Sequence, residues 1–257
     1  MPQPFISITD FMEHDQALAM LRAFTRAGGD KIEHKMGVGV MTHRRILHGI
    51  RSRWANSSPH PHHVAEIFPS DNNAFNVLHY VDYEGIEVPE NLSRAREAGG
   101  KRLHALQLDM CWPDPGALFT FSQMHPGIQL ILQVGRDAFS QVGDSPTRLA
   151  LRLMTYIDSV SYVLLDRSMG EGLPMDADDL ARFVVSIKAT VPQFGIVVAG
   201  GLGPDTLHLV EPLVKRFPDI SIDAQTQLHF GRQQRAPVEW PRADRYLRRA
   251  VEMFADT

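Results

Sequence analysis

Two patterns of apolar residues alternate along this chain. Short runs without polar interruption, such as residues 194–199, are typical of strands covered on both faces in a parallel sheet. Between these runs, apolar residues recur every three or four positions. In residues 177–188 this spacing places Leu180, Phe183 and Ile187 on one face of a predicted amphipathic helix. The pattern therefore predicts a chain in which strands alternate with helices.

Eight strand-like runs and eight helix-like segments follow this order. The predicted strands are residues 5–9, 32–41, 77–81, 103–108, 128–134, 161–165, 194–199 and 220–223. The predicted helices are residues 12–27, 44–54, 89–98, 115–124, 146–160, 177–188, a segment beginning at Pro204, and 242–254. Eight such units in 257 residues predict an α/β fold, a single parallel (βα)8 TIM barrel in one domain. An open doubly wound sheet is the alternative, but its glycine fingerprint is missing after the first run.

Residues 56–73 interrupt the alternation and are predicted to form an irregular surface insertion. They contain three prolines and the histidines His60, His62 and His63. Clustered histidines suggest a metal site. A proline-broken segment without a nearby pair of carboxylates instead favours a solvated loop, and we expect a loop here.

Acidic residues follow five of the predicted strands. They are Asp10, Asp82, Asp109, Asp166 and Asp223, and the adjacent loops carry Arg44, Arg45 and Arg136. Barrel enzymes place their active sites at this end of the strands. We expect Asp10 and Asp82 to serve only as helix caps or turn formers, and the other acids and the arginines to contact a substrate.

Glycines mark two of the predicted loops. Gly170-Glu171-Gly172 follows Asp166, where a flexible loop could fold over a ligand. Gly200 and Gly201 end a strand ahead of Pro204, which suits the first turn of a helix. Backbone N–H groups at such a helix start bind anions, so this junction is a candidate phosphate site. A tight turn without a ligand is the alternative.

Composition narrows the class of protein. Hydrophobic residues make up 44% of the chain and charged residues 22%, and the net charge of −4 argues against a nucleic-acid partner. The lone cysteine, Cys111, fits a reducing compartment. We expect a cytoplasmic protein without a signal peptide or membrane span. The sequence leaves open whether it forms a homodimer.

Several short stretches carry a resemblance to a known family. They are Leu164-Leu165-Asp166, Gly170-Glu171-Gly172, Ala199-Gly200-Gly201-Leu202, Pro204-Asp205 and Ile222-Asp223. In order and spacing they resemble the carboxyl-terminal half of phosphoribosylanthranilate isomerase, a phosphate-binding (βα)8 barrel. The resemblance extends more weakly to residues 7–9 and 107–108.

The resemblance implies specific roles. Asp166 matches the general acid of an Amadori rearrangement, and Gly200 and Gly201 match the diglycine that binds the substrate phosphate. Arg44 or Arg45 matches an arginine that contacts the substrate. The chain departs from the family at two places: no cysteine occupies the first strand, where the family has its general base, and Gln225-Thr226-Gln227 replaces a serine-serine-glycine.

Three interpretations follow. The first is an isomerase that needs no cofactor and acts on a phosphorylated sugar or related small molecule, with Asp166 as general acid. The second is a metal-assisted epimerase or lyase using His34, His79 and Asp109. The third is a ligand-binding barrel without catalytic activity.

Overall fold

Eight parallel strands form a closed barrel, as the sequence predicts. The computed structural model describes residues 2–52, 54, 57–168 and 175–257. The strands pair in sequence order and β8 returns to β1. They are β1 (Phe5–Thr9), β2 (Lys35–His43), β3 (Ala74–Val81), β4 (Ala105–Asp109), β5 (Gln129–Gly135), β6 (Tyr162–Asp166), β7 (Gly195–Ala199) and β8 (Ser221–Ala224).

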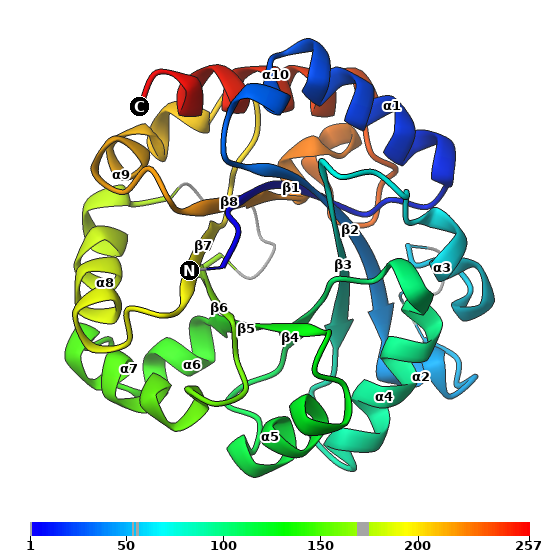
Figure 1. The fold of residues 1–257 in the computed structure, drawn as a ribbon, viewed down its shortest axis with the longest axis vertical. Helices are drawn as coiled ribbons and strands as arrows, with labels where there is room; N and C mark the ends of the chain where they lie inside the picture. The colour runs from blue at the N-terminus through cyan, green and yellow to red at the C-terminus, as the bar shows by residue number, and fades with distance from the viewer. Residues whose placement is uncertain (1, 53, 55–56, 169–174) are drawn as a thin grey trace.

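Helices surround the barrel (Figure 1). They are α1 (His14–Arg26), α2 (Arg44–Leu47), α3 (Val64–Ile67), α4 (Val88–Gly99), α5 (Pro115–Met124), α6 (Arg136–Gln141), α7 (Pro146–Leu153), α8 (Ala177–Thr190), α9 (Glu211–Arg216) and α10 (Trp240–Ala255). The first and last helices, α1 and α10, lie side by side and close the ring. The apolar faces of the helices pack on the outer, aliphatic side of the strands. The strands are therefore buried on both faces, which explains why they appear in the sequence as continuous apolar runs.

Side chains that point into the barrel change from apolar to polar along its axis. At the amino-terminal end, the rings of Phe5, Phe75 and Tyr162 lie 4.9 to 5.8 Å apart, centroid to centroid, and form an aromatic plug. One layer further along come smaller apolar residues, including Val77, Ile131 and Leu164. Polar side chains occupy the barrel only beyond this layer, at the carboxyl ends of the strands.

Two inward-facing glycines let β2 approach β1. A Cβ atom on Gly37 would lie 2.6 Å from Ser7 Cβ and 2.8 Å from Ser7 Cα. A Cβ on Gly39 would lie 2.5 Å from Thr9 Oγ1. These distances are shorter than van der Waals contact, so a side chain at either glycine would clash. The side chains of Ser7 and Thr9 fill the space that the two glycines leave open.

The connection between β2 and β3 differs most from the prediction. Helix α2 has four residues instead of reaching residue 54, because Gly49 adopts a left-handed conformation (φ +67°) just after it. The predicted surface insertion, residues 56–73, contains the short helix α3, and its Val64, Ile67 and Phe68 are buried in the main core. The segment thus occupies the place of a barrel helix. Its prolines interrupt the three-to-four spacing of apolar residues by which the sequence would indicate a helix.

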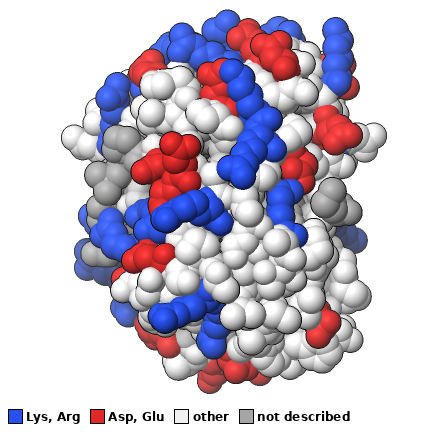
Figure 2. All heavy atoms as spheres, turned by 90° about the vertical axis from the view of Figure 1, so that its left-hand side faces the viewer, with Lys and Arg blue, Asp and Glu red and all other residues white. Residues whose placement is uncertain are grey.

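Charges of both signs are interspersed on the face that carries α8 and α9 (Figure 2). Ion pairs join Lys188 to Asp219, Lys215 to Glu211, and Arg182 to Asp179. Among the residues described, no helix is long and apolar enough to cross a membrane.

Candidate active site

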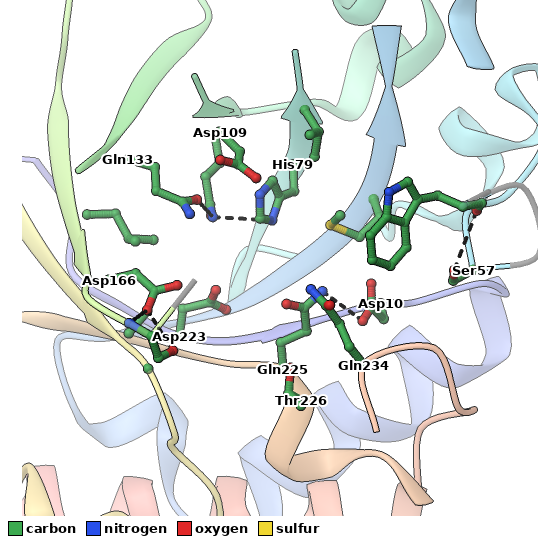
Figure 3. Close-up of a pocket in the computed structure, with 18 of the residues that line it drawn as sticks. Asp10, Ser57, His79, Asp109, Gln133, Asp166, Asp223, Gln225, Thr226 and Gln234 are labelled. Carbon is green, nitrogen blue, oxygen red and sulfur yellow. Dashed lines mark hydrogen bonds between the residues drawn. The ribbon is translucent and has the colours of Figure 1, made fainter. Parts of the chain in front are cut away.

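A pocket opens at the carboxyl ends of the strands, inside the barrel mouth (Figure 3). Its walls are mostly carboxylates, amides, hydroxyl groups and histidines. The lining residues used below are Asp10, Trp54, His79, Tyr83, Gln107, Asp109, Gln133, Asp166, Ser168, Gly200, Gly201, Asp223, Gln225, Thr226, Gln227 and Gln234. Asp109, Asp166 and Asp223, which the sequence predicted as site residues, therefore lie in one cavity.

Asp166 ends β6 and is held by the residue two positions later. The backbone N–H and the Oγ of Ser168 both donate to Asp166 Oδ1, each over 2.8 Å. Two donors on one oxygen favour the ionised form of a carboxyl group. A Cβ on Gly200 would lie 3.0 Å from the same Oδ1, so a residue with a side chain would crowd the carboxylate. The Gly170-Glu171-Gly172 loop lies outside the described residues.

Asp223 lies on β8 beside Asp166 and holds its proton more tightly than an ordinary aspartate does. Thr9 Oγ1 donates to Asp223 Oδ1 over 3.1 Å, and the side chain is 7% exposed. The pKa of Asp223 is raised to about 7, chiefly by burial. Hydrogen bonds from Ser7 and Thr9 oppose this shift, and the negative charges of Asp166 and Asp10 add to it. Near neutral pH this carboxyl group can therefore either give or take a proton.

Asp109 faces the same cavity from β4. Burial raises its pKa to about 6, a hydrogen bond from the Tyr83 hydroxyl opposes this shift, and the charge of Asp166 adds to it. Three acids that influence one another thus share one cavity. Perturbed carboxyl groups in a pocket are typical of catalytic sites.

His79 extends from β3 next to Asp109 (Figure 3). Its Nδ1 lies 3.3 Å from Gln107 Nε2, and Gln107 Nε2 also donates to Gln133 Oε1 over 3.1 Å. Burial, together with the nearby His43, lowers the pKa of His79 to about 3. The ring is therefore neutral at physiological pH.

Asp10 has a different role from the one expected. The N-cap of α1 is Glu13, and Asp10 instead lies at the pocket wall with Oδ2 2.9 Å from His229 Nε2. Gln225 Nε2 donates to the same oxygen over 2.9 Å. The prediction for Asp82 is confirmed, since its Oδ1 accepts from the backbone N–H groups of Glu84 and Gly85 and so forms a turn.

The predicted helix start after Gly200 and Gly201 is wrong. Both glycines have positive φ angles, +108° and +65°, and line the pocket. Residues 204–206 form a turn, a 3₁₀ turn follows, and α9 begins only at Glu211. Asp205, expected at a helix N-terminus, pairs with Arg242 and Arg232. Pro204 is compatible with the first turn of a helix, but Pro212 is as well. The first turn of α9 forms at Pro212.

The arginines predicted for the site lie outside the pocket. Arg44 Nη1 bonds to Glu84 Oε2 over 2.5 Å, and Arg45 lies 4.0 Å from the same carboxylate, in an adjoining surface depression. Arg136 is exposed at the start of α6. Of the residues that the structure describes, no lysine or arginine lines the pocket.

The metal interpretation based on three residues is wrong, because His34 lies at the opposite end of the barrel. Its Nε2 is 2.8 Å from the carbonyl oxygen of Ile220, and its ring packs on Phe254 with the centroids 3.9 Å apart. His34 and His79 cannot share an ion. The exposed histidines His60, His62 and His63 belong to no group of three metal-ligating side chains within the described parts of the chain.

Several pocket residues escaped the sequence prediction. Gln133, Gln225, Gln234 and Trp54 line the cavity, and Ser168 holds Asp166. The sequence did indicate Gln133: side chains alternate along a strand, and this polar residue stands two positions before the end of an apolar run, on the inward face. Gln227 fills space between the last two loops, because its Cβ lies 2.8 Å from the Cβ position of Gly203, and no sequence pattern shows this contact.

Comparisons with known proteins support the fold. The chain matches no family model and no curated protein. Among solved structures it is similar to N-(5'-phosphoribosyl)anthranilate isomerase from Pyrococcus furiosus, with a TM-score of 0.59, 16% identity, and coverage of 97% of this chain and 99% of that one. It is also similar to tryptophan synthase from M. tuberculosis (TM-score 0.54, 14% identity, coverage 98% and 94%). A third is the YdjI aldolase from Escherichia coli K12 (TM-score 0.52, 12% identity, coverage 99% and 90%). At such identities these likenesses establish only the TIM-barrel fold.

Proposed function

We propose that this chain is an isomerase that moves a carbonyl group between neighbouring carbons of a small polyhydroxylated compound of the sugar class. The observation that carries the proposal is the pair Asp166 and Asp223. They share one wall of the pocket, and the pKa of Asp223 is raised to about 7 while Ser168 favours the ionised form of Asp166. One proton between two carboxyl groups supplies both an acid and a base at neutral pH.

The lining supports a sugar-like substrate. Five glutamine amides, from Gln107, Gln133, Gln225, Gln227 and Gln234, offer donors and acceptors, and the carboxylates accept from hydroxyl groups. The Trp54 ring also lines the pocket and stacks on the His43 ring, with the centroids 5.6 Å apart. Such a surface suits a neutral molecule with many hydroxyl groups better than an apolar one.

The proton transfers balance with these two residues. Asp166 takes the proton from the carbon next to the carbonyl, and Asp223 gives its proton to the carbonyl oxygen, which yields an enediol. Asp223 then takes the proton of the neighbouring hydroxyl, and Asp166 returns its proton to the other carbon. Both carboxyl groups end in their starting state, so the cycle needs no redox partner.

This proposal modifies the one drawn from the resemblance. There, Asp166 was the general acid and the base was unidentified. The contacts of Ser168 favour Asp166 as the base and Asp223 as the acid, and they supply the group that the missing cysteine left open. A phosphorylated substrate stays a prediction, and the lining weighs against it, because carboxylates outnumber cations among the described pocket residues.

Deuterium exchange tests the proposal directly. Aldoses and ketoses of four to six carbons, with and without a terminal phosphate, are incubated with the enzyme in D₂O and followed by NMR. Isomerisation with incorporation of deuterium beside the carbonyl supports it. Asp166→Asn and Asp223→Asn should each lower the rate by roughly 10²-fold or more, while Asp158→Asn, at an exposed turn, should not. Binding without turnover would instead favour a ligand-binding barrel.

A further inference from the structure

His79 carries a hydrogen-bond donor without a partner. Its Nε2 is inaccessible to solvent and makes no hydrogen bond to any described residue, and the side chain as a whole is 7% exposed. Buried polar groups are almost always paired, so an unpaired one inside a pocket indicates a role for a ligand. His79 lines the same pocket as the Asp166 and Asp223 pair, on a different wall (Figure 3).

The neighbouring amides fix which ring nitrogen carries the proton. Gln107 Nε2 donates to Gln133 Oε1, so the NH₂ group of Gln107 is the part that faces His79 Nδ1. An NH₂ group only donates, and therefore Nδ1 accepts. In a neutral imidazole the proton then resides on Nε2, the nitrogen that lacks a partner.

We infer that His79 is a further catalytic residue, whose neutral imidazole donates a hydrogen bond from Nε2 to the carbonyl oxygen of the substrate, on which negative charge develops before the proton transfer from Asp223 is complete. The inference rests on the proposed function for the identity of this oxygen. Burial supports it, because it lowers the pKa of His79 to about 3 and keeps the ring neutral. A buried donor that is already oriented stabilises a developing negative charge without reorganisation.

The arrangement divides the work between two walls. Asp166 and Asp223 exchange protons with the substrate on one wall, and His79 keeps its proton on the other. Gln107 acts as a positioning residue, because it sets the tautomer of His79 without touching the substrate oxygen itself. Asp109 lies near His79 but cannot deprotonate a neutral imidazole.

NMR of protein labelled with ¹⁵N at histidine tests the tautomer without any assay of activity. We expect His79 to remain the neutral Nε2–H form from pH 5 to pH 8. Addition of sugar hydroxamates of four to six carbons, whose O–C–N–O group imitates an enediolate, should shift the Nε2–H resonance. His34, which is equally buried at the other end of the barrel, should not respond. A charged His79, an Nδ1–H tautomer, an unmoved resonance or no hydroxamate binding would overturn the inference.

Two variants test the consequence. His79→Phe should weaken hydroxamate binding roughly 10- to 100-fold and lower kcat by roughly 10²-fold with little change in KM. Gln107→Glu should produce a similar loss with His79 still in place, because a carboxylate draws the proton to Nδ1. Full activity in a folded His79→Phe enzyme would refute the role of His79 and leave the proposed isomerase standing. Hydroxamate binding that depends on His79, in a protein that neither isomerises a sugar nor exchanges deuterium, would refute the isomerase and leave the role of His79 as a donor intact.

Discussion

Replacing Asp223 by asparagine should stabilise the protein at high pH. In the folded state the pKa of Asp223 is about 7, against 3.8 for an unperturbed aspartate. The folded state therefore binds the proton more tightly than the unfolded state. The stability linked to this proton is fully present below pH 3.8 and is lost as the pH rises to about 7.

The size of the effect follows from the two pKa values. Each unit of difference corresponds to about 1.4 kcal/mol, and between pH 5 and pH 8 the linkage amounts to about 2.5 kcal/mol. Asparagine has no proton to lose and can still accept from Thr9. The difference in unfolding free energy between Asp223→Asn and the wild type should therefore be about 2.5 kcal/mol more favourable at pH 8 than at pH 5.

Urea denaturation followed by circular dichroism at pH 5, 6, 7 and 8 measures this quantity. Comparing the two proteins across pH removes any fixed cost of the substitution. Asp158→Asn, at an exposed turn, serves as the control and should show no such dependence. If the difference for Asp223→Asn were the same at pH 5 and pH 8, the proton would not reside on Asp223 in the folded state, and the assignment of acid and base would fail with it.

Other substitutions test the packing and the pocket. Gly37→Ala should destabilise the protein by about 1–3 kcal/mol in a urea melt, because the new methyl group would overlap the backbone and side chain of Ser7; Gly127→Ala, with open space around it, should change the midpoint little. Arg44→Ala should leave kcat/KM of the proposed isomerisation nearly unchanged, because Arg44 pairs with Glu84 outside the pocket; a loss above tenfold would place Arg44 at the substrate. Measured by calorimetry, sugars with and without a terminal phosphate should bind with similar affinity. An affinity more than tenfold higher for the phosphorylated sugar would support the predicted phosphate site.

The barrel could be predicted because its signals are local. Apolar runs and three-to-four spacing reflect burial of each element, and eight units have one common closed arrangement. The connection after β2 was missed for the opposite reason. Its four-residue α2 and α3 are too short to show a period, and Val64 and Ile67 are buried through long-range packing that no local pattern reveals.

The site was predictable where the strand end decides the position of a side chain. Asp109, Asp166 and Asp223 follow this rule and share one pocket. Asp10 also follows a strand and lines the pocket; only its expected role as a cap was wrong, because its partner His229 lies 219 residues away. His34 precedes β2, at the opposite end of the barrel, where the rule predicts no site residue. Roles set by contacts across the barrel, such as the Gln107 amide that orients His79, require the three-dimensional structure.

The rings of Phe5, Phe75 and Tyr162 give the pocket a closed floor. In the proposed isomerisation, reactant and product must then use the same opening. The carboxyl groups can exchange hydrogen with water only through that opening, which a bound substrate would block. A proton taken from one carbon should often be returned to the next carbon before bulk water replaces it. Starting from a sugar deuterated beside its carbonyl in ordinary water, part of the isotope should therefore reappear on the adjacent carbon of the product.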